Sequence, residues 1–525
     1  AASWLEDKII ELGADKVAAF VAEPVQGAGG VIVPPDGYFE HIQDICKRYN
    51  ILFIVDEVIT GFGRTGEWFA SQRMNLSPDM MTMAKGLTSG YIPMSGVMVG
   101  DRVANRFIAD GGEFYHGFTY SGHPVAAAVA LANLDIIEGE GLIERAHHMA
   151  PFTDYGEQRK HGARIITHAQ GHYIYDTEGT RILDGMAGLW CVNVGYGRPS
   201  LVDAAAEQMT ALPYYNNFFK TSNKLVVTLS KRLADLSPEG LNNVFYANSG
   251  SEANDTIIRM VRHFWALEGQ PERRVIIGRE YGYHGSTIMS ASMGGMSGMH
   301  DQAANEPDFE HIRPPYGFLY QGNQDEAVFA ANAASWLEDR IIEVGADRVA
   351  AFVAEPVQGA GGVIVPPDGY FAHIEAICRK HDILFIVDEV ITGFGRTGHW
   401  FASEKMGLSP DMMTMAKGLT SGYMPMSAVM VGDRVAARLI ADGGEFYHGF
   451  TYSGHPVAAA VALANLDLIE RENMIETVRD DTGPYFASAL ASLADHRLVG
   501  EVRTFGLLAA IEFVKSKDGP VMFED

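Results

Sequence analysis

The sequence is poor in cysteine and in basic residues. Three cysteines, Cys46, Cys191 and Cys378, are spread over 525 residues, too few and too scattered for a disulfide framework or a zinc site. The 66 acidic residues against 40 basic ones give a formal charge of -26, which repels phosphate backbones and anionic lipid heads. We therefore expect no nucleic-acid partner, no membrane partner and no metal site, in a protein of the reducing cytoplasm.

Long apolar runs are also missing. The run VAAAVALA from Val125 is among the longest and falls well short of the roughly 20 residues that span a bilayer. The N-terminus lacks a basic region followed by an apolar one, so we expect a soluble chain without a cleaved leader. At 525 residues the chain is too long for one compact core, and several domains are expected.

The sequence does contain a long internal repeat. Residues 1–138 match residues 333–470 at a shift of 332, and nineteen of these 138 positions differ. Many differences are mild, such as Lys8 against Arg340 and Leu12 against Val344. One repeat of this length, interrupted by unrelated sequence, excludes a solenoid of short units. We expect two related sequences joined end to end.

Each copy alternates strand-like and helix-like segments. The segments VAAFVAEPVQG and ILFIVDEV are short apolar runs that reach a carboxylate, as is typical of strands buried on both faces of a parallel sheet. Between them, residues 370–381 have helical spacing, so the alternation predicts an α/β architecture. Between the two copies, residues 163–188 carry alternating strands and an Asp-Thr-Glu-Gly turn, which predicts a small antiparallel element.

Candidate chemical groups follow the predicted strands. Asp388 and Glu355 lie at strand ends, as do their counterparts Asp56 and Glu23, and Lys417 follows Asp388 by 29 residues in a turn rich in Gly, Ser and Thr. Ligands of doubly wound sheets bind outside the carboxyl ends of the strands. Taken singly, each group also has a plain structural explanation, because a strand-end carboxylate commonly caps a turn and a turn lysine is commonly solvated.

A further pair of features lies between the copies. Ser249-Gly250-Ser251 precedes an amphipathic helix, and such a start presents free N–H groups to a phosphate or forms an ordinary N-cap. Tyr283 follows the next apolar run, either as a core residue or as a flat surface for a ligand. A phosphate cradle, an aromatic ring, a strand-end carboxylate and a turn lysine together meet the needs of pyridoxal phosphate.

Eight motifs in order identify a family resemblance. They are HHMAPFTDY, GMAGLWCVNVGYG, NSGSEAND, YHGST, AEPVQGAGGV, DEVITGFGRTG, AKGLTSGY and HGFTYSGHP. With them the chain resembles, over essentially its whole length, the class III (omega-) aminotransferases of fold type I, and within these the polyamine and amine:pyruvate group. The resemblance implies a mostly parallel large-domain sheet with a smaller α+β domain, and pyridoxal 5′-phosphate as cofactor. It also implies transfer of an amino group from a putrescine-like diamine or another primary amine to pyruvate.

The resemblance also implies roles for single residues. Lys417 corresponds to the lysine that binds the cofactor covalently and moves the substrate proton, and Asp388 to the partner of the ring nitrogen. The remaining cofactor contacts are Ser249, Gly250 and Ser251 at the phosphate, Tyr283 and Val390 on the two ring faces, and Glu355 near the ring hydroxyl.

Other implied roles concern the substrate pocket and a second chain. Thr451 corresponds to a residue that reaches the phosphate of the neighbouring subunit, so the resemblance implies a homodimer with shared active sites. Trp190 and Phe218 correspond to walls of a pocket for a long or bulky amine. His448 and His455 are expected to be structural.

Relatives place HHMAPFTDY near their N-terminus, whereas here it starts at His147. The leading segment has its own Asp56, Lys85 and Thr119 but no phosphate cradle, so we expect the working residues in the downstream copy. The expected domains are a duplicated partial large-domain segment (1–146), the N-terminal part of the small domain (147–200), the cofactor-binding large domain (201–478) and a truncated C-terminal part of the small domain (479–525).

Three alternatives qualify the predicted activity. Relatives continue for several dozen residues beyond EFVKSKDG and supply an arginine for the carboxylate of the amino acceptor, whereas this sequence ends at Asp525, so impaired binding of keto acids is expected. The same scaffold also hosts racemases and decarboxylases. The third alternative is an inactive fusion whose leading segment packs against, or swaps into, the following unit.

Overall fold

The computed structural model describes residues 2–65, 67–110, 112–138, 151–154, 164–177, 179–303, 305–517 and 521–523. The chain forms two compact units: Ala1–Phe114 with Ser121–Ala163, and Tyr115–Tyr120 with Arg164–Asp525. The short segment 115–120 therefore belongs to the second unit, although it is encoded within the leading copy. The predicted boundary at 146 and the first residues of HHMAPFTDY lie outside the described residues.

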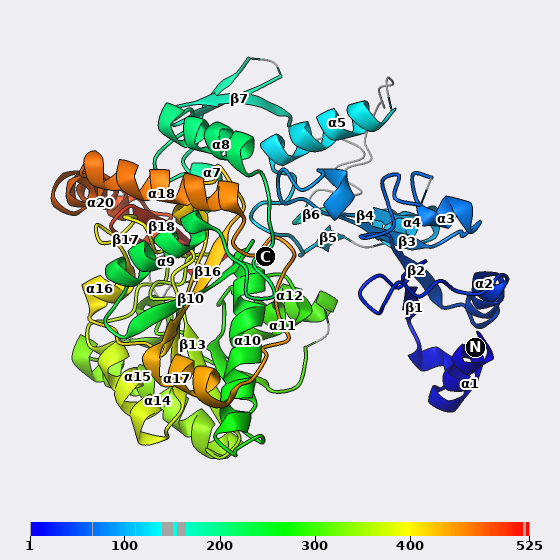
Figure 1. Ribbon diagram of the computed structural model, residues 1–525. Helices are drawn as coiled ribbons and strands as arrows, with labels where there is room; N and C mark the ends of the chain where they lie inside the picture. Colours follow the sequence, from blue (N-terminus) through cyan, green and yellow to red (C-terminus); the bar gives the residue numbers. More distant parts are fainter. Residues whose placement is uncertain are drawn as a thin grey trace. The chain divides into compact units, whose positions relative to one another are not determined.

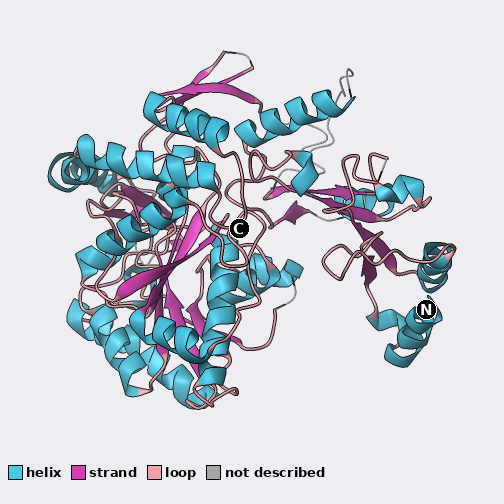
Figure 2. Cartoon of the chain, viewed as in Figure 1, coloured by secondary structure: helices cyan, strands magenta, loops and turns pink. Residues whose placement is uncertain are grey.

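A seven-stranded sheet organises the second unit (Figures 1 and 2). Five of its strands, β12, β11, β13, β14 and β15, are parallel neighbours, while β16 runs antiparallel to β15 and β10 antiparallel to β16. This is the α/β architecture that the sequence predicts. In spatial order the strands are β10 (Leu241–Ala247), β16 (Ser427–Gly432), β15 (Met412–Met415), β14 (Leu384–Asp388), β13 (Val349–Ala354), β11 (Val275–Arg279) and β12 (Phe309–Ile312).

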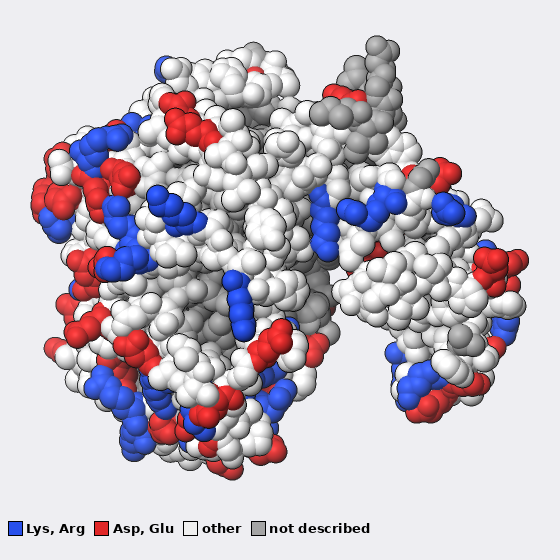
Figure 3. Space-filling model, viewed as in Figure 1, with Lys and Arg blue, Asp and Glu red and all other residues white. Residues whose placement is uncertain are grey.

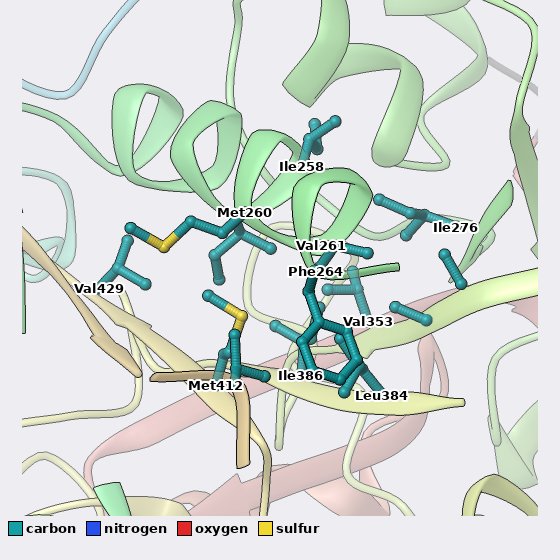
Figure 4. Packing of buried hydrophobic residues seen from close by; sticks show 14 of the residues in the cluster. Ile258, Met260, Val261, Phe264, Ile276, Val353, Leu384, Ile386, Met412 and Val429 are labelled. Carbon is teal, nitrogen blue, oxygen red and sulfur yellow. The ribbon is translucent and has the colours of Figure 1, made fainter. Parts of the chain in front are cut away.

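Helices bury both faces of this sheet. Figure 4 shows Val261 and Phe264 of α10 (Gly250–Leu267) packed over Ile386 and its neighbours on the central strands. On the other face, α14 (Glu326–Val344) and α15 (Tyr370–Lys380) form a second apolar cluster. Every residue of β13, β14, β15 and β16 is buried, which explains why these strands are continuous apolar runs rather than alternating ones.

The first unit contains only part of this arrangement. Its sheet has four strands in the order β1 (Ala19–Ala22), β2 (Leu52–Asp56), β3 (Met80–Met83) and β4 (Gly96–Val99). The register repeats that of the second unit, since Ala19 pairs with Leu52 as Ala351 pairs with Leu384. A core around Ile42 and Val55 lies between this sheet, α1 (Ala2–Leu12) and α2 (Tyr38–Tyr49).

Smaller elements complete the two units. Residues 166–183 form the antiparallel sheet β7 (Ile166–Gln170), β8 (Tyr173–Asp176) and β9 (Arg181–Leu183), as the sequence predicts. A second antiparallel sheet consists of β17 (Val499–Phe505), β18 (Leu508–Ser516) and β19 (Val521–Met522). Further helices are α4 (Asp101–Asp110), α5 (Pro124–Glu138), α8 (Pro199–Ala211), α9 (Lys224–Leu236), α17 (Asp433–Asp442), α18 (Pro456–Arg471) and α20 (Gly483–Ala491).

Two further features are the distribution of charge on the surface and the apolar character of the helices. On the face drawn in Figure 3, basic and acidic side chains are interspersed. In the part of the chain that the structure describes, no helix combines the length and the apolar character needed to cross a bilayer.

Candidate active site

The start of α10 forms a cradle for an anion. Ser249 caps this helix, its side chain accepting a hydrogen bond from the backbone N–H of Glu252 (3.2 Å), and its own carbonyl accepts one from Ser427 Oγ (2.7 Å). Gly250 packs closely against Val390, because a Cβ added to Gly250 would lie 3.3 Å from the Val390 side chain. The free N–H groups and the helix dipole at this end favour a phosphate.

Asp388 is held as a buried anion at the end of β14. Its Oδ1 accepts from the backbone N–H of Val390 (3.0 Å), and its Oδ2 accepts from His284 Nδ1 (2.8 Å) and Asn254 Nδ2 (2.9 Å). Burial alone would raise the pKa of Asp388, but these hydrogen bonds, with that of His284 foremost, hold the pKa below its ordinary value. The site therefore offers a permanent negative charge to a protonated ring nitrogen.

Lys417 stands at the end of β15 in a strained turn. Its φ of 41° lies in the left-handed region, which is costly for a lysine and is typical of functional sites. Asn465 Nδ2 braces the turn by donating to the carbonyls of Gly418 (2.9 Å) and Leu419 (3.1 Å). Burial lowers the pKa of Lys417 to about 8, so about a tenth of its amine is unprotonated at pH 7, far more than for an ordinary lysine, and this fraction can act as a nucleophile.

Tyr283 and Glu355 fix the opposite wall. The backbone N–H of Tyr283 donates to Glu355 Oε1 (3.1 Å), and that of Gly359 donates to Glu355 Oε2 (2.8 Å). Burial raises the pKa of Glu355. The loop after Tyr283 lies tightly against α10, because a Cβ on Gly285 would be 2.6 Å from Ser251 Oγ.

These groups line one pocket, and eight of the nine predicted cofactor residues are among them. The pocket is lined by Thr119, Ser249, Gly250, Ser251, Asn254, Tyr283, His284, Gly285, Glu355, Asp388, Val390, Ile391 and Lys417. The arrangement fits pyridoxal phosphate, because a cradle for the phosphate, a buried anion for the ring nitrogen and a buried amine face the same space. Among the described residues, no group of three or more metal-ligating side chains is arranged to hold a metal ion.

Three predicted residues, Thr451, Phe218 and Trp190, lie outside this lining. The carbonyl of Thr451 accepts a hydrogen bond from Tyr214 Oη (2.6 Å). The Phe218 ring packs against Gly449, so that a Cβ added to Gly449 would lie 2.9 Å from the ring. Lys417 Nζ lies 6.0 Å from the centre of the Trp190 ring.

Several lining or supporting residues were given no role in the site from the sequence. His284, Asn254 and Ser286 lie inside the motifs YHGST and NSGSEAND. Asn254 follows Gly250 by four residues, so Gly250 and Asn254 lie on the same face of the helix, and this spacing could have revealed Asn254. Thr119 stands in the same motif as Thr451, but the identical flanking residues give no signal as to which of the two threonines lines this pocket.

The leading copy's own candidates have a different environment. Asp56 is half-buried and accepts a hydrogen bond from the backbone N–H of Val58 (3.0 Å), while Lys85 is also half-buried. Their counterparts Asp388 and Lys417 are each only 3% exposed. The difference arises because His284, Asn254 and α10 surround the downstream pair.

Comparison with known proteins identifies the family. The family model described as "Aminotransferase class-III" matches residues 3–154 and again residues 155–523. A putrescine–pyruvate aminotransferase of Pseudomonas aeruginosa is 56% identical over 384 residues, which are 73% of this chain and 84% of that protein.

Solved structures give the same result. An (S)-enantioselective omega-transaminase from Thermomicrobium roseum is 41% identical with a TM-score of 0.70, covering 76% of this chain and 86% of that one. The omega-transaminase from Pseudomonas jessenii in complex with PMP is 39% identical with a TM-score of 0.70, covering 72% of this chain and 84% of that one. Sequence, fold and site thus place the chain in one family: it belongs to the class III aminotransferases, enzymes that use pyridoxal 5′-phosphate.

Proposed function

We propose that the chain transfers the amino group of a diamine such as putrescine, or of another primary amine, to pyruvate. The 56% identity to a putrescine–pyruvate aminotransferase supports this substrate pair. The observation that carries the proposal is the shared pocket of Lys417, Asp388 and the start of α10, because it combines a proton-transfer group, a charge partner and an anion cradle.

Lys417 and Asp388 have complementary roles in the proposed reaction. The cofactor, when bound, supplies an electron sink that stabilises negative charge on the substrate carbon. The Lys417 amine, with its pKa near 8, takes a proton from that carbon and returns it, since a base works best when its pKa is close to the working pH. The Asp388 carboxylate keeps a facing ring nitrogen protonated.

The other residues position the cofactor. Ser249, Gly250 and Ser251 would bind its phosphate, and Tyr283 and Val390 would contact the ring. We infer that Glu355 lies beside the ring hydroxyl, a role supported by its place in the pocket lining. Trp190 forms a wall on the substrate side, which its distance to Lys417 supports.

A homodimer and a cytoplasmic location are further proposals. Both rest on the family resemblance, and the second is also supported by three free, buried thiols, Cys46, Cys191 and Cys378. Duplication of a partial large domain as the origin of residues 1–146 is supported by the repeat itself.

The test of function is product analysis. The purified full chain is incubated with pyridoxal 5′-phosphate, putrescine and pyruvate, and alanine is quantified by chromatography. Alanine formed in equal amount to the amine lost is expected. Absence of alanine with putrescine unconsumed would refute transamination. A parallel incubation with L-amino acids, analysed for carbon dioxide release and for the D-enantiomer, then distinguishes a decarboxylase or a racemase from an inactive fusion.

A further inference from the structure

The same ten residues occur twice and lie in two different environments. YHGFTYSGHP runs from 115 to 124 and again from 447 to 456. In the second occurrence Tyr447 is 80% exposed and the Thr451 carbonyl is bound to Tyr214. In the first occurrence, residues 115–120 join the unit that contains the active site. Since the two ten-residue segments are identical in sequence, their different environments depend only on where each one lies in the chain.

The backbone of the first occurrence is fastened to the wall of the pocket. The Gly117 carbonyl accepts hydrogen bonds from Ser286 Oγ (2.5 Å) and Tyr283 Oη (3.4 Å). Two residues earlier, the Tyr115 N–H donates to Gln302 Oε1 (2.6 Å). Tyr283 is itself a lining residue, so the segment is attached to the same side chain that faces the cofactor space.

The other end of the segment is attached to the lysine turn. Tyr120 Oη donates to the Lys417 carbonyl (3.4 Å), and burial raises the pKa of the Tyr120 phenol, so it remains a donor at neutral pH. Thr119 lies between these two attachments and lines the pocket together with Ser249, Gly250 and Ser251. Thr119 is therefore held beside the anion cradle.

We propose that Thr119, encoded in the leading copy, binds the cofactor's phosphate and completes the active site within one polypeptide. This inference rests on the cofactor assignment made above. The leading copy thereby has a function. Thr119 occupies the position at the phosphate that the sequence alone assigns to Thr451 of a second chain. A tethered segment has a fixed effective concentration at its site, so completion does not depend on protein concentration.

The test uses three full-chain variants, Thr119→Val, Thr119→Ser and Thr451→Val. Valine keeps the branched shape and removes the hydroxyl, while serine restores it. The probe is pyridoxamine 5′-phosphate, which binds without a covalent bond to lysine, and its affinity is measured by calorimetry. Pyridoxamine without phosphate is the matched probe, because a general disturbance of the pocket weakens both compounds equally.

The expected pattern is specific. Loss of one hydrogen bond to a charged group should weaken pyridoxamine 5′-phosphate about 10- to 100-fold in Thr119→Val, with pyridoxamine affinity and the Thr119→Ser variant close to the unmodified chain. Thr451→Val should also match the unmodified chain. Equal or greater weakening by Thr451→Val, or equal weakening of both probes by Thr119→Val, would overturn the inference. Failure of the unmodified chain to bind the probe would overturn the cofactor assignment together with it.

Discussion

Replacing Asp388 with asparagine isolates the charge that faces the cofactor ring. The carboxylate accepts three hydrogen bonds, from Val390 N–H at Oδ1 and from His284 and Asn254 at Oδ2. An asparagine has one acceptor oxygen, so its NH₂ group must face either the Val390 N–H or the two donors at the other position. In either orientation a donor meets a donor in a site that is only 3% exposed.

The size of the effect follows from these contacts. Each lost hydrogen bond to a charged group is worth about 1.5–3 kcal/mol, and loss of the anion opposite the ring nitrogen removes stabilisation of charge that develops during proton abstraction. We expect the cofactor to remain bound through the α10 cradle and the barrier to rise by a few kcal/mol, on the order of a hundredfold or more in rate.

The assay is a single-turnover half-reaction with putrescine, followed by the change in cofactor absorbance. The matched control is Asp56→Asn, because Phe53 to Gly66 and Phe385 to Gly398 are identical and only Asp388 has the His284 and Asn254 partners. An unchanged half-reaction rate in Asp388→Asn, or an equal loss in Asp56→Asn, would refute the assignment.

Three further predictions use the same pairing of copies. Lys417→Ala should abolish covalently held cofactor, whereas Lys85→Ala should leave its absorbance nearly intact; equal losses would contradict the choice of the downstream copy. The pKa of Lys417 falls from 10.5 to about 8 on folding, so the folded state binds fewer protons and this lysine's contribution to stability should rise between about pH 8 and 10.5. For the same reason, the rate at which the cofactor-free chain binds the cofactor should increase about tenfold per pH unit below pH 8 and then level off. A rate independent of pH would exclude a buried amine as the nucleophile. Val353→Ala should lower the free energy of unfolding by about 2 kcal/mol, since Val353 is fully buried. Val21→Ala should lower it by under about 0.5 kcal/mol, because Val21 is 60% exposed. Denaturant titration measures both values, and similar values would show that the two strands have the same environment.

The sequence predicts the second unit well because its signals are local. β13 and β14 are continuous apolar runs, and the Ser249 cap is a helix start with recognisable chemistry. The carboxylate at the end of β14 and the lysine at the end of β15 converge because parallel strands end at the same edge of a sheet. Eight of nine predicted cofactor residues therefore line one pocket.

What the sequence could not predict depends on neighbours rather than on residue type. Val21 and Val353 occupy the same position in matching strands, yet one is exposed and the other fully buried, since Val353 belongs to the apolar cluster that α10 forms on the sheet of the second unit. Thr119 and Thr451 likewise share every flanking residue from Tyr115 to Pro124 and from Tyr447 to Pro456. Burial and site membership are tertiary properties, and identical segments cannot encode a difference between them.

The order of the strands along the chain has a consequence for biosynthesis. β1 to β4 are made first, β10 to β12 follow, and β13 to β16 come last. The strands of the two copies differ within the paired segments only at Gly96 and Ala428. Chains fold as they leave the ribosome, so β10, β11 and α10 meet the early set of strands before their native partners exist. The final seven-stranded sheet then forms in competition with a nearly identical template in the same molecule, and its yield depends on the relative rates of synthesis and strand exchange.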